Sequence, residues 1–420
     1  MMIASYDRLI GFDDMTFQPF TRYVMSEATF QTIARNLNDR GQIVSTSCFN
    51  DRTAFRRGRI KERRVGVYRH TAFGDQLIMT GITAWLRHVW PDARIFYFCA
   101  PLVTDIWRWN PHIEFCGGPM TLEFADAMTD HIMYEGMFEN DGEPDQLNCY
   151  DSHLRAAGFD HKKVPARFKR PYIFFNQKEE MYQAELRGKH GDYIVYHWSS
   201  SNLNRMYPPA QSLATLQLLL ERIQIPIIVV GTCDDEEAKL YKLPEGCVDL
   251  RNKTPKFRQI MNMVAASALV IGPDSSVVHV AGGLAKHCIS LWGLFHPNDR
   301  IKYYENAHPI VGFKSCPHAP CRNHEFKLPE EKCYDAGNTV SPPEFCNALR
   351  SIAPLQIVNK AYHILSNDYS TNKQSKPIPA NRSDASVPTT GGSEISTVRG
   401  TEVGEDHFVR RDSERTSTSI

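Results

Sequence analysis

The stretch from Asp192 to Gly293 alternates short apolar runs with amphipathic ones, and this rhythm limits the fold more than any other feature of the chain. The strand patterns are DYIVYHW, IPIIVVG, ALVIG and HCISLWG, and the helical patterns between them are PPAQSLATLQLLLERIQ and PKFRQIMNMVAAS. Short apolar strands that alternate with helices form parallel sheets covered by helices. The segment therefore predicts an α/β domain.

The same rhythm occurs once earlier in the chain. VGVY, from Val65, is the pattern of a buried strand, Gln76 to Val89 is amphipathic, and RIFYFC is the next strand. Two parallel sheets in one chain place the carboxyl ends of their strands, where ligands of open α/β sheets bind, around a central cleft. We expect two α/β domains, at 65–189 and 190–365.

The two ends of the chain lack this rhythm. Residues 1–64 form an extension that ends in the basic run RTAFRRGRIKERR at 52–64. Such a run is typical of a solvated linker or helix face, and the alternative is a patch for an anionic acceptor or a membrane surface. Residues 366–420 contain no Leu, Met, Trp or Cys. They cannot bury enough apolar surface to fold, so we expect a disordered tail.

Composition narrows the functional class. Forty-eight basic residues balance 48 acidic ones, so no global field attracts nucleic acid, and no nucleic-acid partner is expected. No apolar run is long enough to span a bilayer, and the first twenty residues lack the pattern of a secretion signal. Eleven cysteines, an odd number, suit a reducing compartment. We expect a cytoplasmic protein, with peripheral membrane contact through 52–64 as an open alternative.

The turn RHTAFGDQ follows the first strand of the first sheet and opens a helix. Gly74 lies where the backbone must bend sharply or admit a ligand, and Asp75 begins the helix and faces the cleft. Asp75 also has a structural interpretation, because a carboxylate caps a helix and complements its dipole. One glycine in this turn does not make the G-x-G-x-x-G fingerprint of a dinucleotide site.

A second candidate site follows the strand ALVIG. Asp274, Ser275 and Ser276 form the turn, and the first turn of the next helix exposes backbone amides that suit a phosphate. His279 lies four residues after Ser275, so both side chains can share one side of that helix. The structural alternatives are a helix cap made by the DSS cluster and a buried, hydrogen-bonded histidine.

Three stretches together resemble glycosyltransferase family 9, the heptosyltransferases of lipopolysaccharide assembly. They are VYRHTAFGDQLIMTGITAWLRHVWPDARI, HWSSSNLNRMYPPAQSLATL and VIGPDSSVVHVAGGLAKHCISLWG, in the family's order and spacing over roughly residues 64–350. The resemblance implies the GT-B arrangement. In it, an acceptor-side domain at 65–189 faces a donor-binding domain at 190–365.

The resemblance also implies an activity. A member of this family is an inverting glycosyltransferase that moves a sugar, here possibly a heptose, from a nucleotide diphosphate donor to a saccharide or glycolipid hydroxyl. Asp75 aligns with the catalytic carboxylate and would act as general base, with Arg69 and Gly74 on the acceptor side. The residues implied on the donor side are Arg205, Ser199, Ser200, Gly231, Asp274, Ser275, Ser276 and His279. These groups would take the charge of the leaving diphosphate, so neither a metal nor a cofactor is expected.

Several positions depart from the family pattern. Ser276, Arg205 and Tyr207 replace a Gly, a Lys and a Trp, and Phe295 and His296 replace a Thr and an Asp. Arg presents a forked donor set, so its exchange for Lys at a phosphate site is not neutral. The sugar and the nucleotide are therefore left open. The departures also support an alternative, a catalytically lapsed GT-B module that binds nucleotide or glycan without turnover. An epimerase or dehydrogenase would need a dinucleotide loop that the sequence lacks.

Cys316, Cys321 and Cys333 resemble a cysteine group found late in many family members. His318 and His324 lie among them, so a zinc site is one alternative, but the spacing is not the paired C-x-x-C of a zinc ribbon. We expect packed free thiols or one disulfide.

Overall fold

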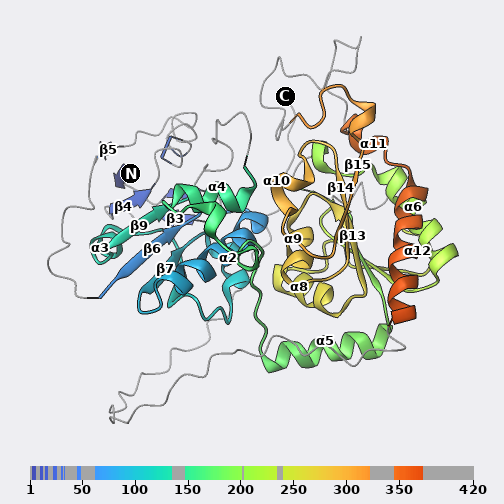
Figure 1. The fold of residues 1–420 in the computed structure, drawn as a ribbon, viewed down its shortest axis with the longest axis horizontal. Helices are drawn as coiled ribbons and strands as arrows, with labels where there is room; N and C mark the ends of the chain where they lie inside the picture. Colours follow the sequence, from blue (N-terminus) through green and yellow to red (C-terminus); the bar gives the residue numbers. More distant parts are fainter. Residues whose placement is uncertain are drawn as a thin grey trace, which may run out of the picture. The chain divides into compact units, whose positions relative to one another are not determined.

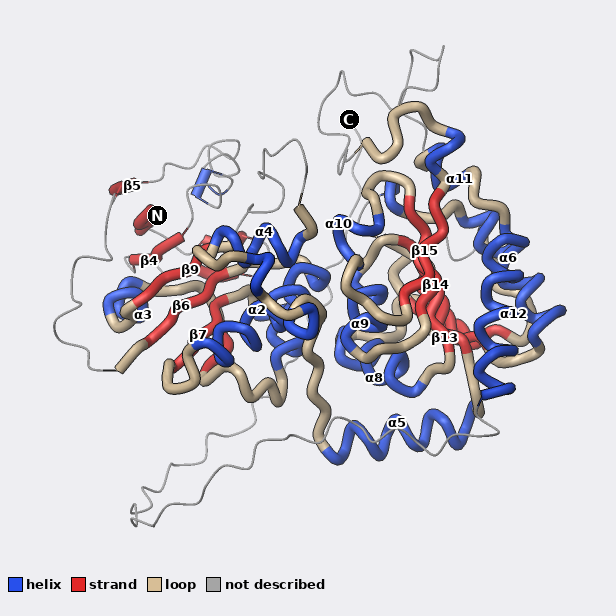
Figure 2. The backbone as a smooth tube through the Cα atoms, viewed as in Figure 1, coloured by secondary structure: helices blue, strands red, loops and turns tan. Residues whose placement is uncertain are grey.

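The computed structural model describes residues 62–134, 147–200, 203–233, 240–321 and 345–371, together with short segments between residues 2 and 48. Figure 1 labels their helices and strands, and Figure 2 colours them by type. Two parallel sheets with helices packed on them make up most of these residues. The predicted α/β fold class is therefore confirmed.

The first sheet has four parallel strands in the order β8-β7-β6-β9. The strands are β6 (Arg64–Tyr68), β7 (Arg94–Phe98), β8 (Phe115–Gly117) and β9 (Asp130–Met133). Helix α2 (Phe73–Val89) joins β6 to β7 and buries an apolar face on the sheet. The shorter helices are η1 (Pro101–Trp107), α3 (Leu122–Asp126), α4 (Cys149–Ala156), η2 (His161–Lys163) and η3 (Ala166–Phe168). The strand-helix-strand unit predicted from Val65 is present.

The second sheet has six parallel strands in the order β12-β11-β10-β13-β14-β15. The strands are β10 (Ile194–His197), β11 (Ile227–Val230), β12 (Cys247–Asp249), β13 (Leu269–Pro273), β14 (Cys288–Trp292) and β15 (Ala307–Val311). The chain begins at β10, builds outward to β12, and returns to the other side of β10 with β13. This reversal is the topological switch point, beyond whose strand ends open α/β sheets bind their ligands.

Helices cover this second sheet (Figure 1). They are η4 (Leu203–Arg205), α6 (Pro209–Ile223), α8 (Phe257–Ala266), α9 (Ser276–Gly283), α10 (Pro297–Ile301), η5 (Phe313–Ser315), α11 (Asn347–Arg350) and α12 (Pro354–Thr371). Helix α12 packs beside α6, and the Tyr207 hydroxyl before α6 donates to the carbonyl of Ile352 at 2.7 Å. Helix α12 continues past residue 365, where we placed the start of the tail. The remainder of that predicted tail lies outside the described residues.

Helix α5 (Gln177–His190) packs against α8. Its first turn is a capping box in which the Asn176 side chain accepts from the Glu179 amide and the Glu179 carboxylate accepts from the Asn176 amide. The same carboxylate pairs with Arg258 of α8 at 2.6 Å. Helix α5 thus lies at the end of the range 65–189 and packs against a helix of the range 190–365.

In the described segments of the N-terminal extension, short strands are present that the sequence patterns did not predict. They are β1 (Met2–Ser5), β2 (Ile10–Phe12), β3 (Met15–Phe17), β4 (Arg22–Met25) and β5 (Ser45–Cys48), paired antiparallel as β4-β1-β5 and β2-β3. Strands of three or four residues are too short to establish a period of two in a sequence.

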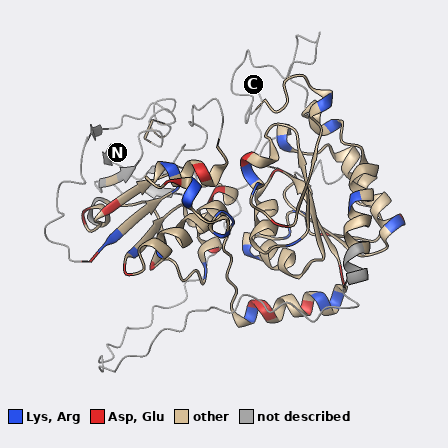
Figure 3. Cartoon of the chain, in the orientation of Figure 1, with Lys and Arg blue, Asp and Glu red and all other residues tan. Residues whose placement is uncertain are grey.

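Acidic and basic residues occur together along the elements. Figure 3 shows acidic and basic residues together on α5. Only the last residues of the basic run 52–64 are described. Among them, Arg63 makes two hydrogen bonds of 3.1 Å to Asp130 and stacks on the Trp90 ring. Within the described part of the chain, no helix is both long and apolar enough to cross a bilayer.

Candidate active site

The loop between β6 and α2 is held by a buried amide. The Gln76 side chain donates to the carbonyls of Arg69 (2.9 Å) and Thr71 (3.2 Å), and it accepts from the indole of Trp107 (3.1 Å). Ala72, just before the helix, has a φ of 67°, a conformation that costs a residue with a Cβ about 1 kcal/mol or more. The buried amide and the surrounding structure therefore impose the backbone at the start of α2.

Asp75 lies in the first turn of α2 between two arginines. Its Oδ2 accepts a short hydrogen bond from Nη2 of Arg69, and its Oδ1 is 3.8 Å from Nη1 of Arg300 in α10. Arg69 is itself anchored, because its Nη1 donates to the carbonyl of Tyr134 at 2.9 Å. The Asp75 side chain is 14% exposed. The carboxylate is therefore paired, nearly buried and still reachable.

These charges set the protonation of Asp75. Burial raises the pKa of this carboxyl, but the positive charges of Arg69 and Arg300, with smaller help from His153, outweigh burial and hold the pKa well below its usual range. The group is ionised at neutral pH and can accept a proton. Its low pKa also makes it a weak base, since a general base works best when its pKa is near the working pH.

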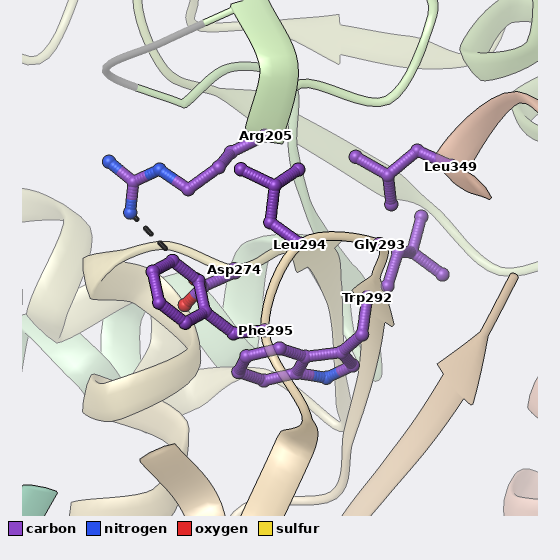
Figure 4. A pocket seen from close by; sticks show the side chains of 8 residues that line it. Arg205, Asp274, Trp292, Gly293, Leu294, Phe295 and Leu349 are labelled. Atoms are coloured by element: carbon purple, nitrogen blue, oxygen red, sulfur yellow. Dashed lines mark ion pairs between the residues drawn. The ribbon is translucent and has the colours of Figure 1, made fainter. Parts of the chain in front are cut away.

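The loops after β10 and β13 carry the predicted donor-side residues. Arg205, at the end of η4, places Nη1 3.8 Å from Oδ2 of Asp274, and Ser200 Oγ donates to the Asp274 carbonyl at 3.4 Å. Figure 4 shows the Arg205 guanidinium directed at Asp274 beside the ring of Phe295. A small pocket is lined by Arg205, Asp274, Leu291, Trp292, Gly293, Leu294, Phe295 and Leu349. Arg205 is the cation at this pocket, and it follows β10, the strand at which the strand order of the sheet reverses.

Helix α9 begins at this same place. Ser275 precedes it, and its hydroxyl shares a 3.0 Å hydrogen bond with Nδ1 of His197, so the side chain does not cap the helix. One turn later, Nδ1 of His279 shares a 2.6 Å hydrogen bond with the Tyr304 hydroxyl. Burial lowers the pKa of both His197 and His279 to about 4. His279 is thus neutral, and its environment is that of the buried, hydrogen-bonded alternative.

Gly231 and Ser199 contact each other. Gly231 has a φ of 120°, and a Cβ there would lie 2.8 Å from the Ser199 hydroxyl. That hydroxyl accepts from the amide of Thr232 at 2.9 Å. The backbone at Gly231 therefore lies closer to Ser199 than a side chain at this position would allow.

Gly74 connects the two groups of predicted residues. A Cβ on Gly74 would meet Cδ2 of His279 at 3.2 Å, and α2 packs against α9, which begins at Ser276. The charges of Asp274, Arg300, Asp75 and Arg205 all act on the pKa of His279. Four of the predicted residues, Asp75, Arg205, Asp274 and His279, therefore lie in one cluster of interacting groups.

The sequence patterns did not predict two members of this cluster. Arg300 stacks on Phe295 with its guanidinium 4.6 Å from the ring centroid, and Tyr304 joins His279 to the hydroxyl of Tyr150 at 3.0 Å. Arg300 is the last residue of the segment WGLFHPNDR, which contains the departures Phe295 and His296, and Tyr304 follows this segment. A basic residue shortly after Phe295 and His296, two positions that depart from the family pattern, was the sequence signal that could have identified Arg300.

The cysteine group is only partly described. Cys316 and Cys321 are thiols, whereas Cys333 and His324 lie outside the described residues. In the described ranges, no three His, Cys, Asp or Glu side chains are close enough to hold a metal ion.

Solved structures share this fold. E. coli ADP-heptose LPS heptosyltransferase II is 12% identical over 73% of this chain and 99% of its own, with a TM-score of 0.54. A family 9 glycosyltransferase from Veillonella parvula is 13% identical over 73% and 97%, with a TM-score of 0.52. The iron-containing dodecameric glycosyltransferase TibC from enterotoxigenic E. coli is 13% identical over 77% and 79%, with a TM-score of 0.51. The fold is thus the GT-B arrangement of two Rossmann-like domains.

The sequence also matches a family model. The model of glycosyltransferase family 9 (heptosyltransferase) matches residues 153–331. Among curated proteins, none matches at a significant level. The resemblance predicted from the three stretches is confirmed: the matched residues are similar to the heptosyltransferases of glycosyltransferase family 9.

Proposed function

We propose that the protein is an inverting glycosyltransferase that moves a sugar from a nucleotide diphosphate donor to a hydroxyl of a saccharide or glycolipid. The observation that carries this proposal is the meeting of Asp75 with the donor-side cluster across the contact of α2 and α9. A base and a set of phosphate-binding cations are the two parts that such a transfer requires. The match to the heptosyltransferase family supports it.

The residues divide the reaction between them. Asp75 takes the proton of the acceptor hydroxyl while that oxygen attacks the anomeric carbon from the face opposite the diphosphate. The bond from that carbon to the phosphate oxygen breaks, and the nucleoside diphosphate leaves with the electron pair. Arg205 and the amides at the start of α9 stabilise the charge on the leaving group. His279 is neutral, so it can add a hydrogen bond but no positive charge.

The nucleotide series of the donor is the first thing to measure. The protein is heated with ADP-, GDP-, UDP- and dTDP-sugars, and a ligand that binds only the folded state raises the unfolding temperature. We expect one series to do so, and we expect Arg205→Gln to remove most of the shift. Arg222→Gln is the control. This exposed arginine contacts the side chain of Asn359 in α12 and, in the part of the chain that the structure describes, none of the predicted donor-side residues. No shift with folded wild-type protein would contradict the donor assignment.

Inversion makes a prediction about the product. Attack opposite the leaving group changes the anomeric configuration, so donor and product should differ in the NMR coupling constants of the anomeric proton. A product that keeps the donor's configuration would contradict a single displacement with Asp75 as base.

We propose that the transfer needs no metal, because Arg205 and Arg300 can supply positive charge beside the diphosphate. Turnover should be unchanged after treatment with EDTA. Loss of turnover that added Fe²⁺, Mg²⁺ or Mn²⁺ restores would reject this part of the proposal. If the acceptor is a glycolipid, residues 52–64 are the candidate contact with the cytoplasmic face of a membrane.

One observation favours the alternative, a lapsed module that binds without turnover. The paired arginines make Asp75 a weak base in the free protein. This alternative predicts a thermal shift with a donor but no release of nucleoside diphosphate with any acceptor.

A further inference from the structure

We propose that Arg300 is shared between the Asp75 carboxylate and the donor diphosphate, so that donor binding releases Asp75 for proton transfer. The inference rests on the proposed function and adds to it the order of events: the base becomes competent only when the donor is bound.

The position of Arg300 suits this role. It lies in α10, which follows β14 of the donor-binding domain, and its side chain is 7% exposed. One side of the guanidinium is 3.8 Å from Asp75, and its face lies over Phe295. Phe295 lines the pocket that also contains Arg205. Arg300 thus contacts the base on one side and a wall of the donor-side pocket on the other.

The two arginines hold Asp75 in different ways. Arg69 donates a direct hydrogen bond and is anchored by a second one to a backbone carbonyl. The 3.8 Å separation from Arg300 exceeds the length of a hydrogen bond, so that contact is a charge interaction without a fixed direction. A diphosphate offers more negative charge than one carboxylate and accepts forked hydrogen bonds from a guanidinium. Arg300 is therefore the partner that a donor can draw away.

Two of the other groups around Asp75, a thiol and an imidazole, carry no charge that could replace that of Arg300. The groups whose charge interacts with Asp75 are Arg69 before α2, Arg300 in α10, Arg205 in η4, His153 and Cys149 in α4, and His279 in α9. The thiol of Cys149 and the ring of His279 stay neutral, because burial raises the pKa of the thiol and lowers that of the imidazole. When Arg300 shifts to the diphosphate, one of the two strongest attractions on the carboxylate weakens. Its basicity rises accordingly.

A double-mutant cycle tests the sharing without measuring activity. ADP, GDP, UDP and dTDP are titrated calorimetrically into the wild type, Asp75→Asn, Arg300→Gln and the double variant. Without the competing carboxylate, Arg300 is free to serve the diphosphate, so Asp75→Asn should tighten the binding nucleotide by about tenfold. Loss of Arg300 should weaken it. In the Arg300→Gln background, Asp75→Asn should tighten binding by less than about threefold. This smaller effect is the direct repulsion between the Asp75 carboxylate and the diphosphate.

The Arg63–Asp130 pair supplies a matched control. It joins the first sheet at the amino ends of β6 and β9, at the opposite edge from Asp75. Arg63→Gln and Asp130→Asn should leave nucleotide affinity unchanged. Arg300→Lys keeps the charge and should retain part of the coupling, which separates a lost charge from a disturbed fold.

The outcomes are distinct. Equal effects of Asp75→Asn in both backgrounds, with nucleotide bound by the wild type, would overturn the sharing of Arg300 and leave the proposed function standing. If the folded wild type binds none of the four nucleotides, both proposals fail.

Discussion

At the scale of single residues, Gly231 is a place where only one residue type fits. Its positive φ disfavours any side chain, and a Cβ would overlap the Ser199 hydroxyl. We predict that Gly231→Ala lowers the free energy of unfolding by about 1–3 kcal/mol, measured by urea denaturation. Adding Ser199→Ala removes the overlap but not the backbone strain, so it should restore part of this loss. Wild-type stability of Gly231→Ala would contradict the account.

The site residues differ in how far sequence could predict them. Asp75 and Asp274 stand in motifs after strands, and the structure brings both into one charged cluster. Arg300 stands in no motif, because its position beside Asp75 comes from the packing of α10 against α4. The family resemblance implied Gly231 on the donor side, but its contact with Ser199 depends on how the β10 and β11 loops fold together.

At the scale of elements, the start of α2 depends on Gln76. Replacing it with Leu leaves two carbonyls and the Trp107 indole without their partner in a buried site. We expect Gln76→Leu to cost about 3 kcal/mol of unfolding free energy and to impair turnover, because the loop that positions Asp75 loosens. Gln217→Leu is the control on α6, where the amide only contacts exposed Glu221. A stable and active Gln76→Leu protein would show that this amide does not hold the loop.

The elements themselves were predictable where apolar runs dominate. All strands of the second sheet from β10 to β14 whose patterns we quoted are present, because fully buried parallel strands read as continuous apolar runs. Helix α5 is polar on most of its surface, so its sequence carried no signal of which sheet it accompanies. Its attachment to α8 comes from the Arg258 to Glu179 pair, a contact between residues far apart in sequence.

At the scale of the whole molecule, contacts between the two sheets' domains surround the site. Tyr150 meets Tyr304, the Tyr303 hydroxyl donates to Asp151 at 2.6 Å, and Asn148 donates to the Asn298 carbonyl at 2.7 Å. These contacts all join α4 to α10 and the residues just after it. They place Arg300 beside Asp75.

The buried histidines predict how stability depends on pH. His197 and His279 have a pKa of about 4 in the folded protein and of about 6.5 when unfolded. Between these values only the unfolded state binds the protons, so stability is full above about pH 6.5 and falls as the pH approaches 4, by up to about 3 kcal/mol for each residue. Asp75 adds its loss only below about pH 4, where the unfolded carboxyl begins to protonate.

Urea denaturation at pH 7.5 and pH 5 measures this loss. His197→Asn, which can keep a hydrogen bond to Ser275, should show a smaller difference between the two pH values than the wild type. Equal stability of the wild type at both would contradict neutral burial of these rings.

The central claim is that Asp75 removes the acceptor's proton within a site that does not need this carboxylate to bind the donor. With the donor series identified, single-turnover release of nucleoside diphosphate should be measured for the wild type and Asp75→Asn with a panel of saccharide and glycolipid acceptors. The account predicts release by the wild type, and a rate lower by about 10²-fold or more for Asp75→Asn although this variant still binds the donor. Release by Asp75→Asn at the wild-type rate would contradict it.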